Sequence, residues 1–264
     1  MAVITLTTEW RSDDFYNGII RGKLCTLCPG TTIVENASCL SPFDISHGSF
    51  IIRNTFMNYP AGSVHIICIL SEARKGAGHL IVKSKGHYFI GTDNGIFSLI
   101  LNSEPDEIIS IDAGETTDEL EVFARAAAGL VSGKKPSELG APIKKINETL
   151  PLRATIDADV IIGSILFIDS YGNAISNITR EIFTRVFGNR DFRIYIVSNL
   201  NFTDTISLNY NDVPVGDLLA RFNSLDLLEF SINGANISEL LSIEPGSSVR
   251  IDVSGKTAPA NRLF

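Results

Sequence analysis

Apolar and polar residues alternate at the start of the chain, and the period then lengthens. Residues 3–8 (VITLTT) carry an apolar side chain at nearly every second position, which is typical of a β-strand with one buried face. From Phe15 to Leu27 the apolar residues recur at helical spacing, and Ser12 or Asp13 is placed to cap such a helix. The first thirty residues therefore predict a strand, a turn and a helix.

Strand and helix patterns continue to mix through the first half of the chain. A short strand is predicted over residues 32–34 and a helix over residues 45–58. Residues 63–70 are apolar on both faces, as in a buried parallel strand. A helix is predicted over the alanine-rich residues 119–130, because a Gly-Lys-Lys-Pro segment that stops helices follows shortly afterwards. This half is predicted to be an α/β domain with a largely parallel sheet.

From Asp159 onward, short β-type runs dominate, separated by clusters of Asn, Gly, Asp and Pro. Such spacing predicts a small antiparallel barrel or sandwich. The predicted strands cover residues 160–168, 192–197, 203–208, 227–232 and 249–253. We therefore expect an N-terminal α/β domain over residues 1–152 and a smaller C-terminal antiparallel β-barrel domain over residues 153–264.

Composition and charge narrow the class of protein. The 264 residues are 44% hydrophobic and 20% charged, and no apolar run approaches the ~20 residues that a membrane span needs. The opening segment lacks the basic start and continuous apolar stretch of a secretory signal, so a cytoplasmic protein is expected. A formal net charge of −8 repels phosphate backbones. We expect no membrane partner and no nucleic acid, and a cationic small molecule fits better.

Cysteine and histidine do not form a recognisable metal site. Cys25 and Cys28 have CxxC spacing, but no second CxxC or CxxH completes a site, so four reduced and mostly buried thiols are expected. The four histidines share no metal-ligand spacing, and His65 lies in an apolar strand where a hydrogen-bonded core imidazole is expected. No metal is predicted.

Phosphate-binding and acyl-transfer motifs are also missing. The glycines around residues 129–135 have the wrong spacing for a phosphate loop and end a helix where such a loop must begin one. The Gly-Ala-Gly at residues 76–78 lacks the third glycine of a dinucleotide loop, and no Gly-x-Ser-x-Gly occurs. What remains is a set of carboxylates and amides at the ends of predicted elements.

One of these polar clusters suits an adenine base, and a further polar cluster lies at Asn223-Ser224 and residues 229–234. Glu9, Asp13 and Asp14 lie within six positions, where the first strand gives way to the first helix. In the turn after residue 168, Asn173 can pair with an adenine edge and Tyr171 can stack on the base. Each cluster alone is also compatible with ordinary turn or helix-cap chemistry.

Taken together, several segments resemble the family of S-adenosylmethionine hydroxide adenosyltransferases, relatives of the fluorinase and chlorinase that attack the same cofactor with halide. The similarity lies in the order and spacing of the segments and runs almost from end to end. The segments are TTE (7–9) with Asp14 and Gly18, PFDI (42–45), PAGSVH (60–65), GTDNG (91–95), ELG (138–140), IDSYGN (168–173) with SNI (176–178), and Asn223-Ser224 through Asn233.

The resemblance implies an N-terminal α/β domain and a C-terminal β-barrel domain. It also implies a homotrimer whose sites lie between the N-domain of one subunit and the C-domain of the next. S-adenosylmethionine would be substrate or ligand, and no further cofactor would be required. In the N-domain, Glu9 would hold the ribose diol, Asp14 would contact the methionine amino group, and Phe43 would line the pocket. Glu9 is one methylene longer than the aspartate usual at its position.

The resemblance also assigns roles to C-domain residues. Asp169 would contact the amino group, while Tyr171 and Asn173 would contact the adenine. Ser224 would bind the methionine carboxylate, and Asn233 would lie beside the adenine.

Three departures from the family pattern affect the expected chemistry. Hydroxide-transferring members share an Asp, Arg and His trio, whose positions fall here on Leu70, Ala77 and Asp118. The halide users' tyrosine also falls on Leu70. Asp118 or Glu119 is then the candidate for orienting water. Two functions remain open: hydrolysis of S-adenosylmethionine at the ribose 5′ carbon to adenosine and methionine, or adenosyl binding without catalysis.

Overall fold

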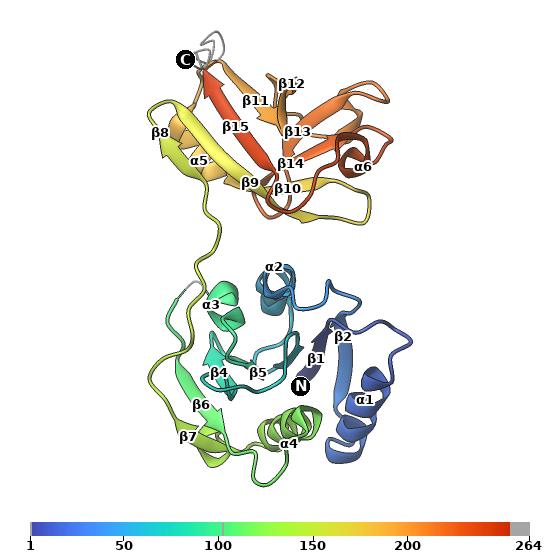
Figure 1. The fold of residues 1–264 in the computed structure, drawn as a ribbon, viewed down its shortest axis with the longest axis vertical. Coiled ribbons are helices and arrows are strands. Elements are labelled where there is room, and N and C mark those ends of the chain that lie inside the picture. The colour runs from blue at the N-terminus through green and yellow to red at the C-terminus, as the bar shows by residue number, and fades with distance from the viewer. Residues whose placement is uncertain (1, 102, 254–264) are drawn as a thin grey trace. The chain divides into compact units, whose positions relative to one another are not determined.

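The computed structural model describes residues 2–101 and 103–253 (Figure 1). The chain divides into two compact units, one that runs to Leu150 and one that begins at Pro151. Each unit has its own sheet and its own hydrophobic core.

A seven-stranded mixed sheet forms the centre of the first unit. Its order is β2-β1-β3-β5-β4-β6-β7, with parallel ladders from β2 to β5 and antiparallel ladders from β5 to β7. The pairings make β4 and β7 run opposite to the other five strands, which confirms a mostly parallel sheet. The strands are β1 Val3–Thr8, β2 Thr32–Ala37, β3 Val64–Cys68, β4 His79–Ser84, β5 His87–Thr92, β6 Glu107–Ile111 and β7 Gly140–Pro142.

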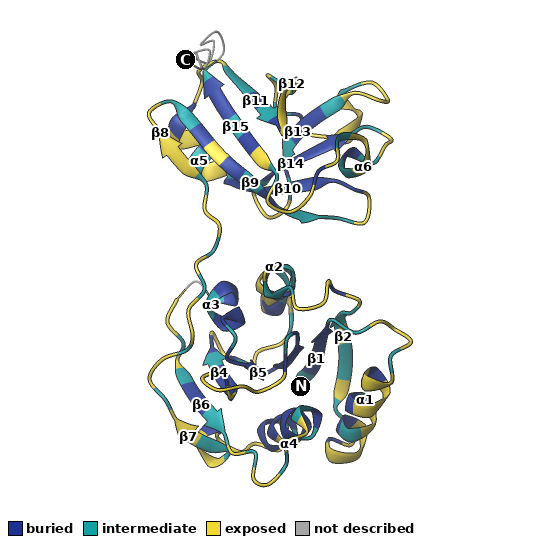
Figure 2. Cartoon of the chain, in the orientation of Figure 1, coloured by how far each residue is buried: buried dark blue, intermediate teal, exposed yellow. Residues whose placement is uncertain are grey.

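Helices cover both faces of this sheet (Figure 1). The core beneath α1 and α4 contains alternate residues of the central strands, such as Ile4 and Leu6 of β1 and Ile66 of β3. Ile67 and Phe89 face the other core, under α2 and α3. Figure 2 shows the buried stripe of α4. The helices are α1 Phe15–Leu27, α2 Ile45–Thr55, α3 Ile96–Ile100 and α4 Glu119–Val131, with single 3₁₀ turns at Phe56–Asn58 and Pro136–Glu138.

Helix α1 begins at Phe15 as predicted, but its cap differs from the prediction by one or two residues. Asp14 occupies the cap position instead of Ser12 or Asp13, and its side chain does not bond to the helix. Asp44 caps α2 by accepting hydrogen bonds from the backbone N–H groups of Ser46 and His47, both at 3.0 Å. The second cap satisfies two N–H groups that have no partner within the helix.

An antiparallel sheet curls into a nearly closed barrel in the second unit. Its order is β12-β11-β15-β9-β10-β14-β13, with β8 paired to β9, and the two end strands contact each other. This confirms the predicted barrel. The strands are β8 Thr155–Asp157, β9 Val160–Ile168, β10 Ala174–Thr179, β11 Phe192–Ile196, β12 Ser198–Thr203, β13 Leu218–Phe222, β14 Leu227–Ile232 and β15 Ser248–Val253, and the helices are α5 Arg180–Val186 and α6 Ile237–Leu241, with a 3₁₀ turn at Tyr210–Asp212.

The strand predicted over residues 203–208 is wrong. Strand β12 ends at Thr203, and the chain then bends away from it. Only Ser207 pairs afterwards, donating its backbone N–H to the Ala220 carbonyl oxygen at 2.8 Å in an isolated bridge to β13. The apolar residues that suggested a strand include Leu208, whose side chain is largely exposed.

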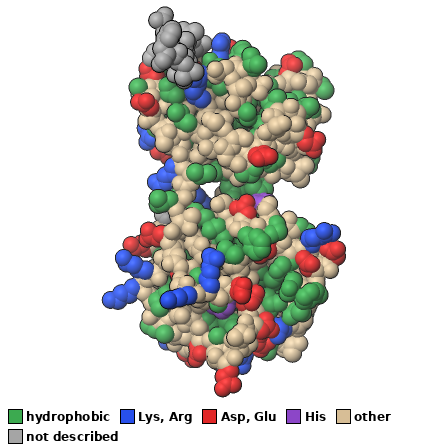
Figure 3. Space-filling model, viewed as in Figure 1, with side chains coloured by type: hydrophobic (Ala, Val, Ile, Leu, Met, Phe, Trp, Pro, Cys, Tyr) green, Lys and Arg blue, Asp and Glu red, His purple; other side chains and the backbone are tan. Residues whose placement is uncertain are grey.

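The cysteines differ partly from expectation. Cys28 and Cys68 are buried, but Cys25 and Cys39 are exposed, so the thiols are not mostly buried. Across the described ranges, no three metal-ligating side chains of the His, Cys, Asp or Glu type gather at one point. The same ranges contain no helix long and apolar enough to cross a membrane. Acidic and basic side chains are interspersed over the face of the first unit shown in Figure 3.

A buried histidine pair connects two neighbouring strands. His65 of β3 is 2.8 Å through Nδ1 from the Thr5 hydroxyl and 3.2 Å through Nε2 from Nδ1 of His87. Its ring also stacks on Phe89. Burial lowers the pKa of His65 to about 3, with a further contribution from His87, and burial also lowers the pKa of His87. The predicted core imidazole is confirmed.

This pair predicts acid sensitivity of the first unit. The folded-state pKa values lie below the ordinary value of 6.5, so the unfolded chain takes up protons first as the pH falls. The stabilisation is complete above pH ~6.5 and decreases toward pH ~3, by at most about 1.4 kcal/mol per pH unit for each imidazole. Urea unfolding at about pH 7 and about pH 5 measures the loss. His87→Gln should reduce the pH dependence, and an unchanged dependence would contradict the assignment.

Candidate functional site

Glu9 follows β1 directly and ties two loops together. Its carboxylate accepts hydrogen bonds from the backbone N–H groups of Phe43 and, at 3.1 Å, of Leu70. Both residues have left-handed backbone, with φ of 65° and 47°, which is uncommon for side chains of this size. The acid therefore holds the loops before α2 and after β3 in place. The Phe43 ring beside it is 70% exposed and available for stacking on a flat ligand.

Polar groups gather where β1, β3 and β5 end, at one edge of the sheet. The Thr92 hydroxyl donates to the Ser71 carbonyl oxygen at 2.5 Å. The Asn94 side-chain amide donates to the carbonyl oxygens of Ile69 and Leu70, both at 3.0 Å. The carboxyl ends of parallel strands are the usual place for ligands in α/β sheets. Sequence reasoning used the GTDNG segment at residues 91–95 only as a match and did not identify these contacts.

Asp93 is a second acid at this edge. It accepts a hydrogen bond from the backbone N–H of Asn147 at 2.8 Å, and the Asn147 side chain donates to the Asp93 carbonyl oxygen at 2.6 Å. Burial raises the pKa of Asp93, and the Asn147 hydrogen bond opposes that shift. Its role here is to fasten the segment around Asn147 to the end of β5.

Glu119 reaches the same sheet edge from the first turn of α4. Its carboxylate accepts a hydrogen bond from the Ser71 hydroxyl at 3.3 Å. Burial raises the pKa of the Cys68 thiol, and the negative charges of Glu119 and Glu9 raise it further. Both acids therefore lie at the end of β3, where they contact Leu70 and Ser71.

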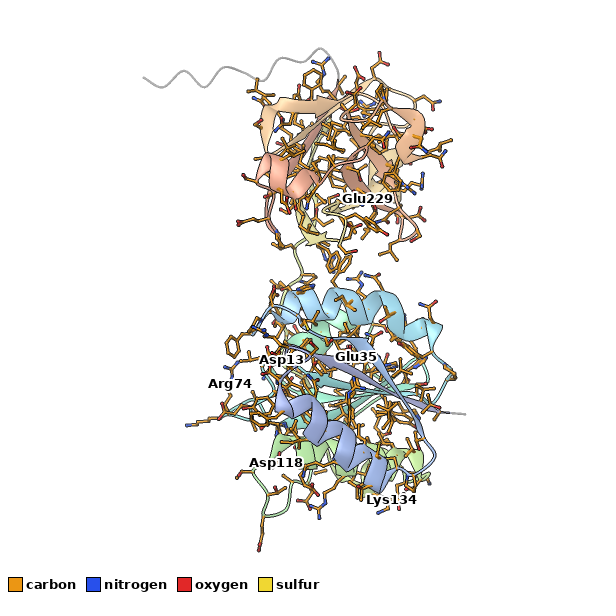
Figure 4. The ribbon with its side chains drawn as sticks, turned by 90° about the vertical axis from the view of Figure 1, so that its right-hand side faces the viewer. Asp13, Glu35, Arg74, Asp118, Lys134 and Glu229 are labelled. Atoms are coloured by element: carbon orange, nitrogen blue, oxygen red, sulfur yellow. The ribbon has the colours of Figure 1, made fainter. Side chains whose placement is uncertain are left out.

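Asp118, the other predicted catalytic acid, is engaged elsewhere. It caps α4 by accepting a hydrogen bond from the Leu120 N–H at 3.0 Å, and its second oxygen lies 3.4 Å from Nζ of Lys23 on α1 (Figure 4). The Lys23 ammonium also contacts Glu121 at 2.5 Å. The hydrogen bond to Glu121 raises the pKa of Lys23, and the interaction with Asp118 raises it further. The Asp118 carboxylate thus stabilises a helix start and a contact between two helices.

Asp14 lies in the turn before α1. It accepts a hydrogen bond from the backbone N–H of Arg11 at 2.9 Å, which closes the turn. The neighbouring Asp13 is exposed and pairs with the Arg11 side chain at 3.2 Å. The predicted amino-group role of Asp14 stays a prediction.

The predicted residues of the β9–β10 turn lie together. The Asp169 carboxylate accepts hydrogen bonds from the backbone N–H groups of Tyr171 and Asn173 and from the Asn173 side-chain amide, all at 2.9 Å. Asn173 is 6% exposed, whereas the Tyr171 side chain is 79% exposed. One amide hydrogen of Asn173 is therefore already used. The turn presents a carboxylate and an exposed aromatic ring side by side.

A buried acid on β14 makes a hydrogen bond that the sequence did not predict. Glu229 is 4% exposed and accepts a hydrogen bond from the Tyr210 hydroxyl at 2.8 Å (Figure 4). Burial raises the pKa of Tyr210 to about 12, and the hydrogen bond to Glu229 contributes to this shift. The Arg221 guanidinium lies 4.6 Å from the centroid of the Tyr210 ring. Glu229 is the register partner of Ile175 at the start of β10, so the group lies near the β9–β10 turn. Tyr210 lies in an irregular loop, where no sequence period marks it.

Ser224 and Asn233 both lie in turns of the second unit. Ser224 is exposed in a turn whose preceding residue, Asn223, accepts hydrogen bonds from Leu225 and Leu227. The Asn233 side chain donates to the Val213 carbonyl oxygen at 2.8 Å. Their predicted ligand contacts stay predictions.

The architecture defines the class of protein: an α/β unit with acids and hydroxyls at the ends of parallel strands, followed by a β-barrel unit. The family model described as the SAM hydroxide adenosyltransferase N-terminal domain matches residues 4–140, and the model of the C-terminal domain matches residues 163–250. The chain belongs to the S-adenosylmethionine hydroxide adenosyltransferase family.

Relatives span nearly the whole chain at low identity. An (R)-S-adenosyl-L-methionine hydrolase from Thermus thermophilus is 26% identical over 273 residues, covering 95% of this chain and 100% of the relative. A fluorinase from an Actinoplanes species is 21% identical over 270 residues, covering 88% and 91%. A crystal structure of an uncharacterized conserved protein from Thermotoga maritima is 20% identical with a TM-score of 0.85, covering 95% of this chain and 100% of that one. This last likeness concerns the fold.

The Glu9 contacts predict a structural role for this acid. Glu9→Ala leaves the N–H groups of Phe43 and Leu70 without their charged acceptor, so we expect a loss of ~1–3 kcal/mol in the free energy of unfolding. Asp13→Ala is the control, because its exposed ion pair with Arg11 contributes little. Urea unfolding measures both variants, and equal stabilities would disprove the structural role.

Proposed function

We propose that this protein hydrolyses S-adenosylmethionine, with water attacking the ribose 5′ carbon to give adenosine and L-methionine. Family membership and the similarity to (R)-S-adenosyl-L-methionine hydrolases support this reaction. The observation that carries it is the Glu119–Ser71 pair at the end of β3. This pair supplies a hydrogen-bonding carboxylate close to the position where relatives carry their trio.

The acids suit a substrate that carries a sulfonium and an ammonium. Glu9, Asp14 and Asp169 would surround it with negative charge, and Phe43 and Tyr171 offer exposed rings for the adenine. Asn173, Ser224 and Asn233 complete the proposed binding set. No cofactor is needed, because the leaving thioether is neutral and the sulfonium already activates the carbon.

The reaction balances with groups of this chain alone. A water oxygen forms a bond to C5′ while the C5′–S bond breaks. The electron pair of the C5′–S bond moves to sulfur, which becomes the neutral thioether of methionine. The water proton passes to a carboxylate, for which Glu119 is better placed than Asp118. Asp118 already accepts from Leu120 and pairs with Lys23, so less of its acceptor capacity remains.

A second function follows from the missing trio. Leu70 places an apolar side chain where relatives carry a catalytic polar group, and Asp118 is engaged in a helix cap and an ion pair. A protein that binds the adenosyl ligand without cleaving it would keep the binding residue Glu9. It would not need the Asp, Arg and His trio. Binding without turnover is therefore the competing outcome of the test.

Adenosine release from S-adenosylmethionine, measured by chromatography, tests the proposal. We expect release from the wild type and a loss of ~10²-fold in turnover for Glu119→Gln, because the amide keeps the shape but cannot take the proton. Asp118→Asn should lose less. A larger loss for Asp118→Asn would reassign the acid, and binding without release would favour the non-catalytic function.

We also propose a homotrimer. The proposed binding residues are divided between the first unit (Glu9, Asp14) and the second (Asp169, Asn173), and the family resemblance joins such sets across subunits. Light scattering at micromolar protein should give about three times the mass of one chain. The mass of a single chain would rule out the shared site.

A further inference from the structure

Thr8, the last residue of β1, has a hydroxyl without a partner. Its side chain is 1% exposed, and its Oγ1 makes no hydrogen bond within the described part of the chain. Leaving a buried hydroxyl unpaired costs on the order of 1–3 kcal/mol, so native proteins seldom do so without a bound water or ligand atom. The group therefore indicates a missing polar partner at the end of β1.

The alternation of β1 shows which way this hydroxyl faces. Ile4 and Leu6 belong to the core under α1 and α4, so Thr8, two residues further on, faces the same side. Its register partner on β3 is Cys68, which belongs to that same core. Helix α4, which begins at Glu119, packs on β3 through this same core, so Thr8 and the start of α4 share one face of the sheet.

The neighbouring Ser71 is held in place by a chain of hydrogen bonds. Thr92 donates its hydroxyl hydrogen to the Ser71 carbonyl oxygen, so the 3.2 Å contact between Thr92 Oγ1 and His79 Nδ1 must use the His79 N–H. Burial lowers the pKa of His79, which keeps the ring neutral at pH ~7. The fixed backbone leaves the Ser71 hydroxyl directed at Glu119.

We propose that Thr8 and Glu119 hold the attacking water at the end of strands β1 and β3, with Ser71 positioning the Glu119 carboxylate. This inference rests on the hydrolysis proposed above and adds the residues that position its nucleophile. The Thr8 hydroxyl fixes the water oxygen, and Glu119 accepts the proton released as the oxygen bonds to C5′ and the C5′–S bond breaks. Ser71 orients Glu119 and is a positioning residue, as are Thr92 and His79.

Replacing Thr8 by residues of matched size tests the inference. Thr8→Val keeps the shape but removes the hydroxyl, and we expect kcat for adenosine release to fall by ~10²-fold with an unchanged KM. Thr8→Ser restores the hydroxyl and should recover most of the rate. Thr7→Val is the matched control, because Thr7 is equally buried on the same strand but faces the other side and already accepts a hydrogen bond from Asn36.

The outcomes separate this inference from the proposed function. A loss in Thr8→Val alone, with rescue by Thr8→Ser, supports the water site. A fully active Thr8→Val, or an equal loss in Thr7→Val, overturns the water site while leaving hydrolysis intact. A wild type that binds S-adenosylmethionine without releasing adenosine overturns both.

The Ser71 role has its own readout. Ser71→Ala leaves Glu119 without its hydroxyl donor, so kcat should fall with an unchanged KM, and Ser71→Thr should recover most of the rate. A purely structural role would lower the melting temperature of Ser71→Ala without a selective loss of kcat. Full activity of Ser71→Ala would therefore remove Ser71 from the site.

Discussion

The hydrogen bonds from Phe43 and Leu70 to the Glu9 carboxylate are the contacts on which the strand-end site depends. Two loops from different parts of the chain converge on one acid, and both converging residues adopt left-handed backbone. A carboxylate offers about four acceptor positions, so the two N–H groups leave room for the diol of a ribose. Structural and ligand-binding roles can therefore coexist on the same side chain.

This arrangement explains how the first unit concentrates negative charge without unfolding. Glu9 and Glu119 approach the end of β3, where Cys68 is buried, and like charges in such a place repel each other. Hydrogen bonds from backbone N–H groups and from Ser71 offset part of that cost. A cationic ligand would offset more of it. Under the proposed function, this charge pattern would favour a cationic substrate for a physical reason that does not depend on the family.

The sequence predicted the elements whose period is regular. Strand β1, helices α1 and α4, and the barrel strands β9 and β14 all follow clear alternation or helical spacing. The strand at 203–208 failed because apolar residues there, such as Leu208, are exposed in a bend. Tyr210 carried no signal, and Thr8 entered only as part of the first strand and the TTE segment, since the contacts around both residues join segments distant in the chain.

Asp118 shows why a matched position does not carry a matched role. Its place at the start of α4 favours a short acceptor that bonds to the Leu120 N–H, and a carboxylate there is stabilised by the helix dipole. The same place brings Lys23 of α1 within 3.4 Å. Glu119, one residue further and one methylene longer, instead reaches Ser71 at the strand end. A single step along the first turn thus separates an acid that holds the helix from an acid that faces the ligand edge.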